Sequence, residues 1–229
     1  MFDHIRENLE KINKNISEAA RRSGRKPEEI TLVAVSKTYP AEAITAAVGF
    51  GIADVGESRV QEAEPKIQSL GKIARWHMIG HLQTNKAKKA VAVFDFIQSV
   101  DSLKLAEEIN RQAGEINRKI DCLIEINSAG ESSKSGLAPE MAAELIEKAG
   151  KLENIILRGI MTIGPLTDDR QLIRNAFRKT RRLFEDGRKS AGNQFDTLSM
   201  GMSDDYEIAI EEGSNMVRIG TAIFGSRNK

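Results

Sequence analysis

The chain has 229 residues, 40% of them hydrophobic, which is enough to bury a large core in one sizeable domain. Lys and Arg number 34 against 33 Asp and Glu, and the resulting net charge of +1 argues against nucleic acid or a membrane surface as the partner. The single cysteine, Cys122, excludes an internal disulfide, and no apolar run is long enough to span a bilayer. We therefore expect a cytoplasmic protein with a small ligand.

An amphipathic helix is predicted over residues 3–23, where Ile5, Leu9, Ile12 and Ile16 recur at helical spacing. After it, short apolar strands alternate with helical segments. The predicted strands are 31–36, 53–57, 75–79, 95–100, 120–127, 155–163, 195–199 and 215–219. The predicted helices are 40–50, 58–71, 83–92, 102–118, 138–151, 168–191 and 204–213.

This alternation predicts an α/β fold. Strand–helix units of about 25 residues, joined by right-handed crossovers and repeated eight times, close into a (β/α)8 barrel of the TIM type. A doubly wound open sheet is the alternative. No Gly/Ser-rich linker or change of composition interrupts the pattern, so we expect residues 1–229 to form a single barrel domain preceded by the N-terminal helix.

Lys37 is the predicted chemical centre. It follows an apolar strand, and its parity places it on the same face as Thr31, Val33 and Val35. An ordinary lysine, with a pKa of about 10.4, is almost fully protonated at pH 7, but burial in apolar surroundings lowers that pKa and exposes a nucleophilic amine. The alternative is a strand-end lysine that extends into solvent.

Two glycine-containing loops follow the seventh and eighth predicted strands, at residues 199–205 and 218–225. In a barrel of this type these loops often bind phosphate. Gly201 and Gly220 let the backbone approach a ligand, and the hydroxyls of Ser203 and Thr221 can donate to it. For Ser203 the alternative is simple capping of the helix that follows.

Arg218 lies near the end of the eighth strand, where a buried guanidinium needs an acceptor. A lysine amine, a phosphate cradle and this arginine are together what pyridoxal 5′-phosphate (PLP) requires: an amine for its aldehyde, donors for its phosphate and a group facing its ring nitrogen. His77 and His81 are four residues apart, but they lie on either side of a strand end, so helical ligand spacing does not apply and no metal site is expected.

Several long motifs resemble those of the pyridoxal phosphate homeostasis proteins, single-domain barrels similar to the N-terminal domain of alanine racemase. The motifs are VAVSKT (33–38), GESRVQE (56–62), WHMIGHLQTNK (76–86), SVDS (99–102), ESSKSG (131–136), GIMTIG (159–164), LSMGMSDDYEIAI (198–210) and VRIGTAIFG (217–225). The resemblance implies that Lys37 forms the Schiff base, that Ser203, Gly220 and Thr221 hold the phosphate, and that Arg218 faces the pyridine nitrogen.

Two positions within these motifs need comment. The family's usual GEN reads Gly56-Glu57-Ser58 here, so the contact that an asparagine amide makes with the cofactor is in question at Ser58. The motif ESSKSG supplies Lys134, which the resemblance links to secondary handling of the cofactor. The predicted cofactor-binding residues are Lys37, Ser58, Met202, Ser203, Arg218, Gly220 and Thr221.

The predicted function is PLP homeostasis, with the protein a carrier or regulator rather than a turnover enzyme. An arginine at the ring nitrogen weakens the ring as an electron sink, and racemisation needs a second acid/base that alanine racemases take from a partner domain. The alternatives are an amino-acid racemase of this fold, with Tyr39 as the substitute base, and a class I aldolase acting through Lys37. We expect PLP-dependent apo-enzymes as recipients, and a monomer or weak dimer.

Overall fold

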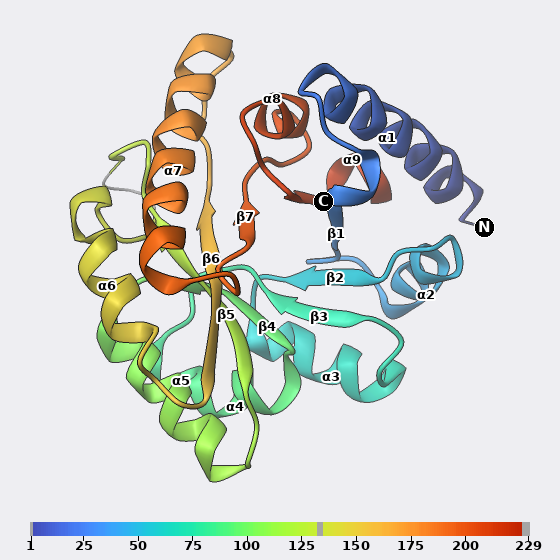
Figure 1. Cartoon of the computed structure of the whole chain (residues 1–229). Coiled ribbons are helices and arrows are strands. Elements are labelled where there is room, and N and C mark those ends of the chain that lie inside the picture. The colour runs from blue at the N-terminus through green and yellow to red at the C-terminus, as the bar shows by residue number, and fades with distance from the viewer. Residues whose placement is uncertain (1, 132–134, 226–229) are drawn as a thin grey trace.

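A closed barrel of parallel strands forms the centre of the molecule (Figure 1). The computed structural model describes residues 2–131 and 135–225. The strands are β1 (Thr31–Val35), β2 (Asp54–Glu57), β3 (Arg75–Met78), β4 (Phe96–Val100), β5 (Ile120–Ile126), β6 (Ile155–Thr162), β7 (Thr197–Ser199) and β8 (Met216–Ile219). Because β8 pairs with β1, the sheet has no free edge. The predicted barrel is confirmed, and the open-sheet alternative is wrong.

Helices surround the barrel and connect its strands. The α-helices are α1 (Asp3–Arg22), α2 (Ala41–Gly49), α3 (Val60–Leu70), α4 (Ala87–Val93), α5 (Leu103–Glu115), α6 (Ala142–Ala149), α7 (Arg170–Ala191), α8 (Tyr206–Glu211) and α9 (Thr221–Phe224). Short 3-10 turns lie at η1 (Pro27–Glu29), η2 (Thr84–Lys86) and η3 (Pro139–Met141). The helix whose bounds differ most from the prediction is α6, which begins four residues later than expected and ends two residues earlier. Helix α8 begins two residues later than expected and ends two residues earlier.

The apolar core has two parts, as expected for strands whose successive side chains face opposite ways. A small inner cluster gathers one side chain from each of five strands: Val33, Phe96, Leu123, Met161 and Met216. A much larger cluster, which includes Ala34 of β1, fills the space between the barrel and the helices. The residues of β1 therefore alternate between the inside of the barrel and the surrounding helical layer.

The N-terminal helix α1 packs against the helices that follow β7 and β8. Its apolar stripe is buried, as predicted, and α1 lies beside α8 and α9 in Figure 1. Asn8 donates to the carbonyl of Ile223 in α9 at 2.9 Å, and Arg22 pairs with Glu211 of α8 at 2.8 Å. The helix thus supports the backbone behind the two loops at which phosphate binding is predicted.

In the part of the chain that the structure describes, no helix combines the length and the apolar character that crossing a membrane requires.

Candidate functional site

Lys37 lies in a turn two residues after the end of β1. It is half-buried, whereas the face that it was predicted to share with Val33 and Val35 would have enclosed it. The strand ends at Val35, and the backbone N–H of Ser36 still donates to the carbonyl of Gly56 at 3.0 Å. The buried Ser36 donates through its hydroxyl to Glu57 at 2.7 Å, and its carbonyl accepts from the Lys66 ammonium at 3.0 Å. These bonds fix the backbone from which the Lys37 side chain extends.

A group of charged residues beneath this turn was not anticipated from the sequence. Lys66 bridges Glu57 at 2.7 Å and Glu62 at 3.0 Å, and Glu62 also accepts from the backbone N–H of Thr38. Burial raises the pKa of Glu57, against the opposing effect of hydrogen bonds from Lys66 and Ser36. Thr38 adopts φ of 70°, a conformation unusual for a β-branched residue, so the surrounding bonds hold a strained turn next to Lys37.

The loops after β7 and β8 meet, as the phosphate-cradle interpretation requires. The Ser203 and Thr221 hydroxyl oxygens are 3.4 Å apart, and the backbone N–H of Ala222 donates to Ser203 Oγ at 3.4 Å. The alternative interpretation of Ser203 as a helix cap is wrong, because α8 begins only at Tyr206. Gly201 has φ of 93°, and a Cβ there would lie 2.6 Å from Ala209, so this turn requires glycine.

The end of β8 lies directly beside the end of β1. Ala34 pairs with Ile219, and a Cβ added at Gly220 would lie 3.2 Å from the carbonyl oxygen of Val35. The turn that carries Lys37 and the loop that carries Thr221 therefore start from neighbouring strand ends. This adjacency is the geometry that one ligand needs if it is to reach both a lysine amine and a pair of hydroxyls.

Arg218 is almost fully buried, at 3% exposed, and its partners are neutral. Its guanidinium donates to Ser199 Oγ at 2.6 Å and to the carbonyl of Thr162 at 2.8 Å. Burial lowers the pKa of Arg218 to about 10, while the charges of Asp205 and Glu125 act in the opposite direction. A guanidinium held in this way has further N–H groups to offer, and a neutral aromatic nitrogen is a suitable acceptor for one of them.

Met202 and Ser58 lie in different parts of the rim. Met202, 37% exposed, donates its backbone N–H to Asp205 at 2.6 Å and lines a cavity of about 640 Å³ with Ile163 after β6. Ser58 follows β2 and lines a separate cavity of about 430 Å³ with His81. The structure thus brings Ser203, Thr221 and Gly220 together, with Arg218 just before them. Ser58 follows the strand that pairs with β1, since Val35 pairs with Gly56. Lys134 lies outside the described residues.

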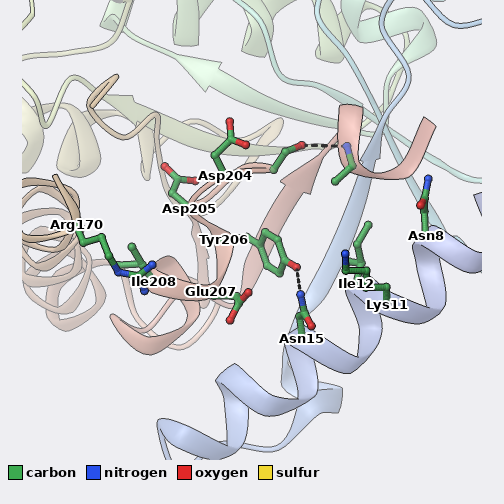
Figure 2. Close-up of a pocket in the computed structure, with 12 residues that line it drawn as sticks. Asn8, Lys11, Ile12, Asn15, Arg170, Asp204, Asp205, Tyr206, Glu207 and Ile208 are labelled. Carbon is green, nitrogen blue, oxygen red and sulfur yellow. Dashed lines mark hydrogen bonds between the residues drawn. The ribbon is translucent and has the colours of Figure 1, made fainter. Parts of the chain in front are cut away.

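A further cavity, of about 380 Å³, lies behind the cradle between α1 and α8 (Figure 2). Ser203 contributes to its wall, and Tyr206 faces it, with its hydroxyl accepting from Asn15 of α1 at 3.0 Å. The other tyrosine, Tyr39, donates its hydroxyl to the carbonyl of Gly225 at 2.6 Å and packs on Phe224. Both tyrosine hydroxyls therefore have protein partners.

Glu125 was missed by the sequence reasoning. It shares a face of β5 with Leu123 of the inner cluster and is 3% exposed, and its Oε2 has no hydrogen-bond partner among the described residues. Burial, reinforced by the charge of Asp101, raises the pKa of Glu125 to about 7, and the charge of Arg218 opposes this. Parity along the predicted strand 120–127 was the signal that places this carboxyl inside the barrel.

Comparison with known proteins identifies the family of the chain. A family model described as the N-terminal domain of alanine racemase matches residues 8–228. The chain is 43% identical to the pyridoxal phosphate homeostasis protein of Haemophilus influenzae, covering 98% of this chain and 97% of that one, and 42% identical to the protein of the same name from Escherichia coli, covering 99% and 98%. The chain therefore belongs to the family of pyridoxal phosphate homeostasis proteins, within the alanine racemase N-terminal domain class.

Solved structures give the same result. The crystal structure of an unknown protein from Bifidobacterium adolescentis superposes with a TM-score of 0.93 at 37% identity, covering 97% of this chain and 95% of that one. PipY of Synechococcus elongatus, solved with PLP bound, has a TM-score of 0.81 at 36% identity, covering 92% and 100%. Alanine racemase of Clostridium difficile shares the fold, with a TM-score of 0.80 at 21% identity over 99% of this chain and 61% of that one.

Proposed function

We propose that this protein binds pyridoxal 5′-phosphate as a Schiff base on Lys37 and serves as a carrier or regulator of the cofactor rather than as a turnover enzyme. The observation that carries the proposal is the convergence of three groups at neighbouring strand ends: Lys37 after β1, the Ser203–Thr221 hydroxyl pair and the buried Arg218. The pyridoxal phosphate homeostasis proteins to which the chain is similar and the PLP-bound PipY structure support it.

The residues present fit this cofactor. Bound PLP supplies an aldehyde that condenses with an amine and a ring that withdraws electrons. Ser203 and Thr221 supply hydroxyl donors for the phosphate, and Arg218 supplies an N–H for the ring nitrogen. Because Arg218 is itself a cation, it leaves that nitrogen unprotonated, which suits storage of the cofactor better than carbanion chemistry.

The arrangement of the tyrosines favours a carrier over a racemase. A racemase needs an acid or base on each side of the substrate α-carbon. The chain has only two tyrosines, and the hydroxyls of Tyr39 and Tyr206 contact Gly225 and Asn15. We further propose that PLP-dependent apo-enzymes receive the cofactor, that nucleic acid is not a partner, and that the protein acts in the cytoplasm as a one-domain monomer or weak dimer.

The test is to load the protein with PLP, reduce it with borohydride and locate the modified lysine by mass spectrometry. We expect the adduct on Lys37, and we expect Lys37→Ala to lose the visible absorbance of the Schiff base. Lys86→Ala, which changes another lysine at the rim, is the matched control and should keep it. An adduct on Lys134 or any other lysine, with full absorbance in Lys37→Ala, would refute the assignment.

A further inference from the structure

A continuous line of hydrogen bonds leads from Arg218 across the inside of the barrel to the start of β2. Arg218 donates to Ser199 Oγ at 2.6 Å, and Ser199 donates to Gln98 Oε1 at 2.7 Å. Gln98 Nε2 lies 2.9 Å from His77 Nδ1, and His77 Nε2 lies 2.8 Å from the Asp54 carboxylate. The line passes through β8, β7, β4, β3 and β2.

The middle of this line is completely enclosed. Ser199, Gln98 and His77 are all 0% exposed, Arg218 is 3% exposed, and the Asp54 side chain is 16% exposed. A buried polar atom without a hydrogen-bond partner destabilises the folded state, so each member of the line depends on the next one for its partner. Networks of this kind are held in one arrangement only when every member has its partner.

The two ends determine the direction of every bond. A guanidinium can only donate and a carboxylate can only accept, so protons point from Arg218 towards Asp54 along the whole line. Asp54 therefore sets the His77 tautomer with hydrogen on Nε2, and the free Nδ1 then accepts from the Gln98 amide nitrogen. That turns Gln98 Oε1 towards Ser199, which leaves the lone pairs of the serine available to Arg218.

The surroundings of His77 support this assignment. Burial lowers the pKa of His77, against the opposing effect of its hydrogen bond to Asp54, so burial favours the neutral ring, which has one donor and one acceptor nitrogen. Its ring packs against Phe96 of the inner cluster, with centroids 5.0 Å apart. Gln98 also donates to the sulfur of Met216 at 3.2 Å, which is consistent with the amide nitrogen pointing away from Ser199.

We propose that Gln98, backed by His77 and Asp54, is a positioning residue that holds Arg218 in the orientation in which it meets the cofactor ring. This inference rests on the proposed PLP-binding function. Thr162 fixes one side of the guanidinium through its carbonyl, and Ser199 fixes the other. Without Gln98, the Ser199 hydroxyl loses its acceptor and rotates to find another, so the guanidinium loses one of its two supports.

The first experiment measures the dissociation constant of PLP for three variants. Gln98→Met keeps the length of the side chain but removes both polar atoms, and we expect it to weaken PLP binding about five- to tenfold. Asp54→Asn, which does not touch the proposed site, should weaken binding in the same direction because asparagine lets the line reverse. Thr180→Val is the control. Thr180 is as buried as Gln98, but its hydroxyl donates to the carbonyl of Ala176 within α7, so the PLP affinity of this variant should equal that of the wild type.

The second experiment separates positioning from a general loss of stability. The effect of Gln98→Met is measured again in an Arg218→Met background, as a double-mutant cycle. If Gln98 acts through Arg218, the loss of affinity caused by Gln98→Met disappears in that background. If both backgrounds show the same loss, Gln98 has only a structural role and the inference is wrong.

The remaining outcomes also decide the matter. Wild-type protein that fails to bind PLP refutes the proposed function itself, whereas wild-type binding with an unchanged Gln98→Met affinity refutes only the positioning role. If Gln98→Met does not fold, Ser199→Ala enters the same cycle, since it removes the link to Arg218 and leaves Gln98 in place. Equal PLP affinity for Ser199→Ala and wild type would then overturn the inference.

Discussion

At the level of single residues, the inside of the barrel is unusual for the charge that it encloses. Arg218 and Glu125 both lie inside the barrel, beside the inner apolar cluster. Among the described residues, the two side chains do not form an ion pair with each other. Burial disfavours the charged form of each, so the arginine pKa falls to about 10 and the glutamate pKa rises to about 7. We therefore expect pH and ligand binding to change the stability of the folded state through these two groups.

The pH dependence of Glu125 has a definite sign. Its pKa rises from 4.5 to about 7 on folding, so between these values the folded state binds the proton more tightly, and stability falls as pH rises through this window. At pH 8 the charged carboxyl costs up to about 3 kcal/mol. We predict that Glu125→Gln stabilises the ligand-free protein at pH 8 by up to that amount and has little effect at pH 4.5, as measured by urea unfolding.

The control for this prediction is Glu153→Gln, which removes an exposed carboxyl. It should show no comparable difference between the two pH values. If Glu125→Gln changes the free energy of unfolding equally at pH 4.5 and pH 8, the raised pKa assigned to Glu125 is wrong. The charged groups that influence this site in the structure are Asp101 and Arg218, and neither is altered by the substitution.

At the level of elements, the two loops after β7 and β8 act as a unit because their hydroxyls meet. A hydrogen bond to a charged group is worth about 1.5–3 kcal/mol, so we predict that Ser203→Ala or Thr221→Ala weakens PLP binding by roughly ten- to a hundredfold. Binding of pyridoxal, which has no phosphate, should change little. Titration of both ligands measures this ratio, and equal losses for the two would show that these loops do not hold the phosphate. Thr45→Val, on the exposed face of α2, is the matched control.

The junction of β6 and β7 depends on one glycine. Gly159 has φ of 151°, and a Cβ there would lie 1.9 Å from the carbonyl oxygen of Thr197, where the register between β5 and β6 also shifts. We predict that Gly159→Ala destabilises the fold by about 3 kcal/mol or more, because the strands must separate. Gly49→Ala places a methyl group in open space at the end of α2 and should be neutral or stabilising by up to about 1 kcal/mol. Thermal unfolding that ranks the two variants in the opposite order would contradict this account.

At the level of the whole molecule, the question is whether a loaded barrel turns over amino acids. We predict that the holo-protein racemises alanine far below about 1 s⁻¹, because a missing general acid or base costs 10²–10⁴ in rate and Arg218 weakens the electron sink. Chiral analysis of amino acids incubated for hours with the yellow protein measures this. Racemisation at 1 s⁻¹ or faster would establish the racemase alternative, with Tyr39 as the first candidate base. An aldolase, by contrast, would be colourless as purified.

Much of the architecture was predictable from the sequence because its signals are local. Short apolar strands with turn residues at their ends alternate with segments whose apolar residues recur at helical spacing, and this pattern specifies eight βα units. Right-handed crossovers leave few ways to arrange these units. The same pattern placed Arg218 at the end of β8 and Lys37 just after β1. It did not predict that Lys37 lies half-buried in a turn, because strand parity no longer applies beyond Val35. The boundaries of α8 did not, because Ser203 and Asp204 carry a capping signal that the backbone does not use.

Only the tertiary structure decided how the site is supported. Ser203 bonds to the residues after β8 rather than to its own helix, because the closed sheet brings β7 and β8 together. Gln98 reaches Ser199 across the inside of the barrel, and Lys66 reaches the carbonyl of Ser36 from helix α3. No local pattern encodes such contacts, since they join residues far apart in the chain, and their partners are defined only once the barrel has closed.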